Sequence, residues 1–195
     1  MTSAPIGDTP RASVTVLAGP TAVGKGTVSA AIRRRYPEIW LSVSATTRPP
    51  RPGEVDGVHY RFVDDAEFTR MVEGDEMLEW AVVHGRNRYG TPREDVAAAV
   101  AAGRPVLLEI DLAGARQVRR SLPGARFVFL APPDFDTLVE RLVGRGTEGP
   151  EERERRLATA RLELAAESEF DVTIVNDDVE RAADALAREM GVEPH

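Results

Sequence analysis

The sequence predicts an α/β fold in which a five-stranded parallel sheet is flanked by helices. Short apolar runs alternate along the chain with longer segments of helical pattern, which is the order expected of β-α-β units. The runs are rich in Val, Leu and Ile, as in strands that are covered on both faces. A glycine-rich loop follows the first run directly and opens a helix, an arrangement typical of phosphate binding.

The expected strands lie at residues 14–17, 40–43, 106–110, 126–130 and 172–175. Helices are expected between them, at residues 27–36, 95–102, 114–121, 134–143, 151–168 and 179–190. The first helix illustrates the reasoning, because Val28, Ile32 and Tyr36 share one face and three arginines occupy its last turn before Pro37.

Two segments interrupt this alternation. Residues 44–91 are rich in Pro, Gly, aromatic and charged residues, and we interpret them as a β-rich insertion with one short helix near residues 65–73. Residues 144–150 form a polar loop between two helices, which suits a mobile lid. We therefore expect a single domain over residues 13–192, with a core (13–43, 92–135 and 169–192), the insertion (44–91) and a lid region (136–168). Residues 1–12 are expected to be a disordered tail.

Composition limits the possible partners. The net charge is −7, which disfavours general binding to nucleic acid. The chain has no cysteine and only three histidines, so thiolate and zinc sites are not expected. No apolar run approaches the ~20 residues that a membrane span needs. We expect a cytoplasmic protein that binds neither nucleic acid nor membrane.

The glycine-rich loop has the sequence of a phosphate-binding loop. Its only lysine, Lys25, is also the only lysine of the whole chain, and every other basic side chain is arginine or histidine. A lysine is a compact charge that reaches between two phosphates, while backbone N–H groups of the loop wrap them. The alternative is a strand-to-helix turn without a ligand. The predicted ATP-binding residues of the loop are Gly19, Pro20, Thr21, Ala22, Val23, Gly24, Lys25, Gly26 and Thr27.

The position after the lysine departs from the usual pattern. Ser or Thr normally stands there to bind Mg²⁺, whereas here Gly26 is followed by Thr27. The third strand ends in Glu109 and Asp111, which project to one face, and an acid at this place can organise Mg²⁺ and water. We predict Thr27 and Asp111 as metal ligands, Asp111 through water if not directly. The alternative for Asp111 is a helix cap.

Two further groups of residues in the insertion suggest a second ligand. Arg48 and Arg51 flank two prolines, and two planar guanidinium groups can neutralise a phosphate dianion with help from the Tyr60 hydroxyl. Glu79, if buried, could accept two parallel N–H bonds from the edge of a guanine, a donor pair that adenine lacks. The alternatives are an exposed Pro/Arg loop and a surface acid.

A last group of arginines surrounds the lid loop. Phosphoryl transfer needs positioning and charge stabilisation more than covalent chemistry, and arginines on a closing lid supply both. The alternative is pairing along the helix, such as Glu151 with Arg155. The residues of this group are Arg141, Arg145, Arg155 and Arg156.

Taken together, these segments resemble guanylate kinases from about residue 14 to residue 190. The shared motifs are the phosphate loop, Ser-Ala-Thr-Thr-Arg-Pro-Pro-Arg-Pro-Gly-Glu, Asp-Gly-Val-His-Tyr, Tyr-Gly-Thr, Glu-Ile-Asp, Gly-Arg-Gly-Thr-Glu and Val-Asn-Asp-Asp. The resemblance implies a P-loop kinase core, a GMP-binding insertion and a lid over ATP. Ala22 and Ala45 depart from it, at positions where the family often has glycine and histidine.

The resemblance also implies residue roles. Arg48, Arg51, Tyr60 and Tyr89 would hold the GMP phosphate, and Ser44, Glu79 and Thr91 would read the base with Asp111 nearby. Lys25 would hold the ATP phosphates, and Arg141, Arg145 and Arg156 would stabilise the transferred group. Asn176 matches a position near ATP.

The sequence therefore predicts a transferase that moves the γ-phosphoryl of MgATP to GMP or dGMP. One alternative is a non-catalytic module that binds phosphorylated proteins through the GMP site, which the intact phosphate loop disfavours. Another is a kinase of the same fold that acts on ribose bisphosphate. Such a kinase would not need residues that recognise guanine.

Overall fold

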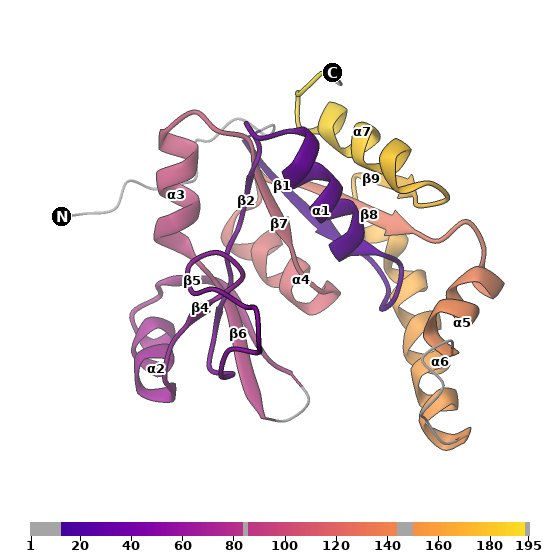
Figure 1. Ribbon diagram of the computed structural model, residues 1–195, viewed down its shortest axis with the longest axis horizontal. Coiled ribbons are helices and arrows are strands. Elements are labelled where there is room, and N and C mark those ends of the chain that lie inside the picture. Colours follow the sequence, from indigo (N-terminus) through magenta and orange to yellow (C-terminus); the bar gives the residue numbers. More distant parts are fainter. Residues whose placement is uncertain (1–12, 84–85, 144–149, 194–195) are drawn as a thin grey trace.

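The computed structural model describes residues 13–83, 86–143 and 150–193. Its main sheet has five strands in the order β2-β7-β1-β8-β9, all parallel (Figure 1). The strands are β1 (Val14–Ala18), β2 (Trp40–Leu41), β7 (Val106–Glu109), β8 (Arg126–Ala131) and β9 (Val172–Val175). The predicted α/β fold with a five-stranded parallel sheet is confirmed. The expected tail, residues 1–12, lies outside the described residues.

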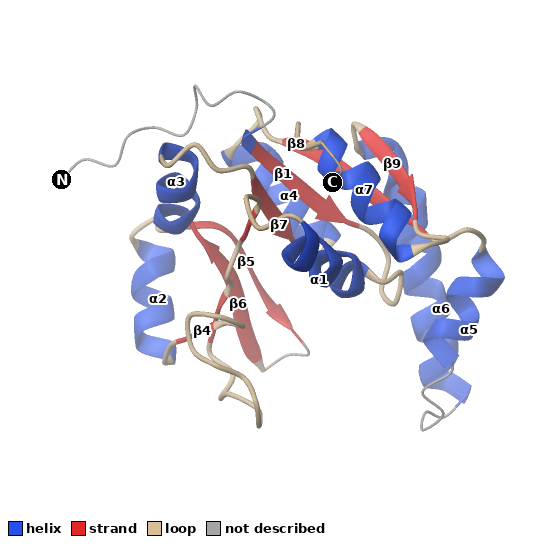
Figure 2. Cartoon of the chain, turned by 45° about the horizontal axis from the view of Figure 1, so that its top comes forward, coloured by secondary structure: helices blue, strands red, loops and turns tan. Residues whose placement is uncertain are grey.

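Helices cover both faces of this sheet (Figure 2). On one face, α1 (Lys25–Arg35) packs beside α7 (Val179–Glu189), and Leu17, Ile32 and Leu186 belong to their shared apolar core. On the other face, α3 (Arg93–Ala101) and α4 (Leu112–Ser121) enclose a second core with Val16 and Phe127. The alternate side chains of β1 thus enter opposite cores, as a doubly covered parallel strand requires.

The insertion has a sheet of its own, in the order β4-β3-β6-β5. Its elements are β3 (Ala45–Thr46), β4 (Arg61–Phe62), α2 (Asp65–Glu73), β5 (Met77–Val83) and β6 (Asn87–Pro92). The long strands β5 and β6 are antiparallel, and Phe68 and Met71 of α2 form a small core with Ala45 and Met77. The limits that we expected for the domain and its parts stay predictions.

Two further helices form what we call the helical arm. They are α5 (Phe135–Val143) and α6 (Pro150–Ala165), and a 3₁₀ turn, Ala166–Glu169, continues α6. Figure 1 shows the insertion and the arm projecting from the same end of the core, with the loop between β1 and α1 between them. In the described part of the chain, no helix is long and apolar enough to cross a membrane.

Candidate active site

The loop between β1 and α1 has a backbone that demands glycine at two positions. Gly24 has a φ of 100°, and a Cβ on it would lie 2.6 Å from Nδ2 of Asn176. A Cβ on Gly19 would lie 2.3 Å from the carbonyl oxygen of Leu130 in β8. Ala22 also has a left-handed backbone, with a φ of 66°. This conformation costs an alanine about 1–2 kcal/mol, which explains why glycine suits that position better.

Lys25 begins α1 and reaches back across the loop. Its Nζ donates to the carbonyl oxygens of Gly19, at 2.7 Å, and Pro20, at 3.2 Å. Burial lowers the pKa of this amine, and the carboxylates of Glu109, Glu163 and Asp111 oppose that effect. A phosphate oxygen is a stronger acceptor than a carbonyl, so the ammonium group can exchange these two bonds for an anion.

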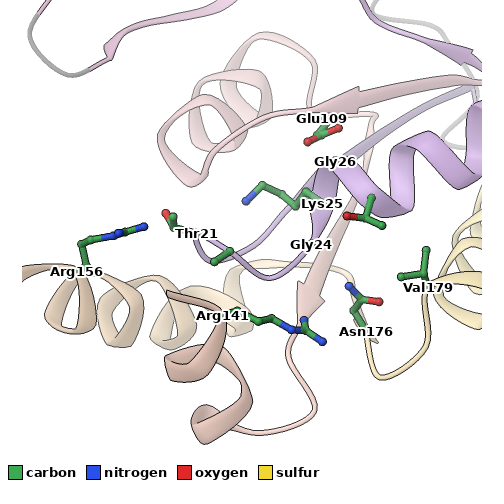
Figure 3. Close-up of a pocket in the computed structure, with 11 residues that line it drawn as sticks. Thr21, Gly24, Lys25, Gly26, Glu109, Arg141, Arg156, Asn176 and Val179 are labelled. Atoms are coloured by element: carbon green, nitrogen blue, oxygen red, sulfur yellow. The ribbon is translucent and has the colours of Figure 1, made fainter. Parts of the chain in front are cut away.

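A cleft of about 630 Å³ opens over the loop (Figure 3). Arg141 of α5 and Arg156 of α6 line this cleft together with Lys25. Three of the residues that we predicted to act on the phosphoryl group therefore meet there. Arg145 lies outside the described residues. The lining also includes Thr21, Ala22, Gly24, Gly26, Thr27, Glu109, Asn176 and Val179.

Asn176 holds the phosphate loop through a side-chain hydrogen bond. Its side chain is buried, and its Nδ2 donates to the carbonyl oxygen of Val23 at 2.8 Å. Nη1 of Arg141 donates to the same oxygen at 3.1 Å. Both side chains therefore fix the turn of the loop that precedes Gly24, and Asn176 does so just after β9, at the carboxyl edge of the sheet.

Glu163 of α6 contacts the phosphate loop, which the sequence did not indicate. Its Oε2 accepts the backbone N–H of Thr21 at 2.8 Å, and its Oε1 accepts the Thr21 hydroxyl at 3.4 Å. The arm is thus tied to the tip of the phosphate loop by a carboxylate. The two residues are 142 positions apart, so no local pattern could have revealed their contact.

The two acids at the end of β7 have different surroundings. Glu109 lines the cleft, where its Oε1 would be 3.6 Å from a Cβ on Gly26. Oδ1 of Asp111 instead accepts the N–H of Gly114 at 2.7 Å and caps α4, the role that we weighed as the alternative. The hydroxyl of Thr27 and the carboxylate of Glu109 are hard oxygen donors of the kind that Mg²⁺ takes beside water and phosphate. The residues of the cleft therefore fit this ion, and the predicted ligands Thr27 and Asp111 stay a prediction.

Arg48 is the centre of a cationic group in the insertion. It is only 8% exposed, which rules out the alternative of an exposed loop at this residue. Its Nη2 donates to Glu54 at 2.8 Å and its Nε to the hydroxyl of Tyr89 at 3.1 Å. The guanidinium lies 5.3 Å from the ring centre of Tyr60. Glu54 raises the pKa of Arg48, and Arg48 in turn lowers the pKa of Glu54 to about 2, so both remain charged.

Arg51 joins this group through its backbone. Its N–H donates to Oε2 of Glu54 at 2.7 Å, while its side chain is exposed. Tyr60 and Tyr89 meet edge to face, with ring centres 5.8 Å apart. Arg48, Tyr60 and Tyr89, three of the four residues predicted to hold a phosphate, therefore contact one another. Glu54 links the fourth, Arg51, to them, because it accepts from both the Arg48 guanidinium and the Arg51 backbone.

Glu79 is buried on β5, so the alternative of a surface acid is wrong. It is 7% exposed, and its Oε1 accepts the hydroxyl of Thr91 at 2.7 Å. Burial, with help from the nearby charge of Asp111, raises the pKa of Glu79 to about 7. Ser44 comes directly before β3, whose Ala45 pairs with Gly90 beside Thr91. A carboxylate held this way can accept paired N–H groups from a planar base.

These features define the class of protein. A phosphate loop at the carboxyl edge of a parallel sheet, a cluster around a buried arginine in an insertion and a helical arm that carries arginines are the parts of a P-loop nucleoside monophosphate kinase. The chain belongs to the guanylate kinase family, because the family model for guanylate kinase matches residues 11–192.

Several relatives agree with this assignment. A guanylate kinase of Thermobifida fusca (strain YX) is 66% identical over 173 residues, which cover 89% of this chain and 88% of the relative. A guanylate kinase of Streptomyces coelicolor is 60% identical over 184 residues, covering 94% of this chain and 93% of the relative. The crystal structure of guanylate kinase from Anaplasma phagocytophilum matches with a TM-score of 0.70 at 30% identity, covering 94% of this chain and 86% of that chain.

Proposed function

We propose that this protein transfers the γ-phosphoryl group of ATP to GMP or dGMP, in a reversible reaction that gives ADP and GDP or dGDP. The observation that carries this proposal is the buried carboxylate of Glu79, which lies in the same insertion as Arg48 in a chain that also has a phosphate loop. An acceptor that combines an anion with a guanine satisfies both parts of the insertion.

On the ATP side, the loop N–H groups and Lys25 cradle the phosphates, and Asn176 and Arg141 hold the loop in shape from Val23. Arg141, Arg145 and Arg156 stabilise the transferred group. Thr27, Glu109 and Asp111 are the residues that would hold Mg²⁺. The bound ion supplies positive charge that offsets the charge of the ATP phosphates.

On the acceptor side, Arg48, Arg51, Tyr60 and Tyr89 bind the phosphate of GMP. Glu54 prepares this site, because it holds the guanidinium of Arg48 and the backbone of Arg51 with its two oxygens. The base is read by Ser44, Glu79 and Thr91, with Asp111 beside them.

The chemistry needs no strong base, because the attacking oxygen belongs to a phosphate that is already an anion. The main barrier is repulsion between two anions, and the arginines and Lys25 lower it within an acidic protein. We expect the arm and the insertion to approach each other when both substrates are bound, which would exclude water from the transferred group.

Specific residues disfavour the two alternative functions. A non-catalytic module has no need of Lys25 or of the loop geometry that Gly24 and Asn176 maintain. A ribose bisphosphate kinase has no need of a buried carboxylate at position 79. Since ATP and GMP are cytoplasmic metabolites, we also propose that the protein works in the cytoplasm, in purine nucleotide metabolism.

The test is ADP production from MgATP with GMP, dGMP, AMP, CMP, UMP or ribose bisphosphate as the acceptor. We expect turnover with GMP and dGMP alone, and loss of this preference in the Glu79→Gln variant. Turnover with ribose bisphosphate alone would overturn the acceptor site but keep the phosphate loop. A folded protein without turnover that still binds phosphorylated peptides would favour the non-catalytic module.

A further inference from the structure

Gly114 is a glycine in the first turn of α4, where its backbone does not require one. Its φ is not among the positive values that favour glycine. Glycine inside a helix costs about 0.5–1 kcal/mol relative to alanine. A residue at this place therefore has a different reason to lack a side chain.

The reason is the space beside it. A Cβ on Gly114 would lie 2.9 Å from Oε2 of Glu79 and 3.3 Å from both Cδ of Glu79 and Oδ1 of Asp111. The carboxylate of Glu79 cannot simply turn away, since it is buried and its other oxygen is bonded to Thr91 at 2.7 Å. The side chain would have to give up this bond or its place.

The helix cannot move away either, because it is bonded to β5 on both sides of Glu79. The side-chain amide of Gln117 accepts the N–H of Trp80 at 3.1 Å and donates to its carbonyl oxygen at 2.9 Å. The hydroxyl of Ser121 donates to the carbonyl oxygen of Leu78 at 3.0 Å. Leu78 and Trp80 flank Glu79, so α4 and the backbone of β5 are held at a fixed separation there.

We propose that Gly114 is a positioning residue for base selection: its missing side chain leaves the space in which the Glu79 carboxylate is held toward the guanine edge. The inference rests on the proposed role of Glu79. It adds a residue of the core, outside the insertion, to the part of the protein that selects the base.

The test is the Gly114→Ala variant, with the discrimination between GMP and inosine monophosphate as its readout. Inosine monophosphate keeps the N1 proton but lacks the 2-amino group, so a displaced carboxylate loses the second bond that separates the two nucleotides. We expect KM for GMP to rise about tenfold or more and the kcat/KM ratio of GMP to inosine monophosphate to fall by a similar factor. KM for ATP should stay within about twofold.

Two controls isolate the contact. Ala113→Ser changes the exposed neighbour in the same turn and should leave KM for GMP and the kcat/KM ratio of GMP to inosine monophosphate unchanged. Glu79→Asp shortens the acid by one methylene, so adding Gly114→Ala to it should cause no further loss of GMP selectivity. If Gly114→Ala alone does not fold, the double variant should, because the shorter acid leaves room for the added methyl group.

The outcomes separate this inference from the proposed function. Unchanged selectivity in Gly114→Ala, with selectivity lost in Glu79→Gln, would overturn the role of Gly114 and leave the function standing. If KM for ATP and KM for GMP rise equally in Gly114→Ala, Gly114 has a merely structural role and the inference is overturned. A double variant that also fails to fold would overturn it in the same way. Full selectivity in Glu79→Gln would overturn the guanine-reading role on which it rests.

Discussion

Glu79 should make GMP binding depend on pH in the neutral range. Burial and Asp111 raise its pKa from the ordinary 4.5 to about 7, so the carboxyl group of the free protein is half protonated near neutrality. The N–H groups of guanine need the ionised form. Binding should therefore weaken as the pH falls below 7, by about tenfold at pH 6 relative to pH 8.

The same pKa affects stability, with the opposite preference. The folded state binds this proton more tightly than the unfolded chain, so the contribution is favourable below pH 4.5 and is lost as the pH rises through 7. The difference in pKa corresponds to about 3 kcal/mol for a group that is almost fully buried. The Glu79→Gln variant, which does not titrate, should be more stable than the native protein by up to this amount at pH 8.5 and equally stable near pH 4.5.

The assay is calorimetric titration with GMP between pH 6 and pH 8.5 at constant ionic strength. The GMP phosphate has its own ionisation near pH 6 and would mimic part of the effect. Guanosine, which has no phosphate, and the Glu79→Gln variant remove the two contributions separately. Guanosine affinity that is flat across this range, or equally dependent on pH in the variant, would refute the assignment.

Four substitutions test other parts of the site. Lys25→Ala should lower kcat by about 100-fold or more and leave GMP binding within about twofold, and a folded, fully active variant would contradict this role. Arg48→Lys cannot bond Glu54 and Tyr89 together, so KM for GMP should rise about tenfold while KM for ATP is unchanged in steady-state kinetics. Asn176→Ala removes a buried bond to the loop and should lower the free energy of unfolding in urea by about 1–2 kcal/mol and weaken ATP binding. Ala22→Gly relieves a left-handed alanine and should stabilise the protein by up to about 1 kcal/mol without loss of activity, whereas a destabilised variant would show that no strain is stored there.

The order of strands and helices could be predicted because each element carries its own pattern. The strand at residues 172–175 and the helix at 65–73 have the limits that we expected. The second strand is shorter, since the chain leaves the sheet after Leu41 to enter the insertion, although Ser42 still donates its N–H to the carbonyl oxygen of Leu107 at 2.9 Å. The first helix begins earlier, at Lys25, because Gly24 makes the turn into it.

The parts of the site that belong to a local sequence motif could be predicted. The contacts between residues that are far apart in the sequence could not. The phosphate loop and the Arg48 segment could be recognised from local residues. Burial of Glu79 could not, because an acid on a strand is exposed more often than not. The bond from Thr21 to Glu163 and the fit of Gly114 against Glu79 depend on how separate elements pack, which no local pattern encodes.

The position of Lys25 makes the nucleotide site accessible to a simple chemical probe. Apart from the α-amino group, its ε-amine is the only primary amine in the chain. Burial lowers its pKa, so more of it is in the nucleophilic form than for a surface lysine. Acylating reagents should therefore modify Lys25 and the α-amino group, while the arginine side chains stay unmodified. A bound nucleotide should shield the Lys25 amine from the reagent, and coupling of the protein to a support through Lys25 should abolish its activity.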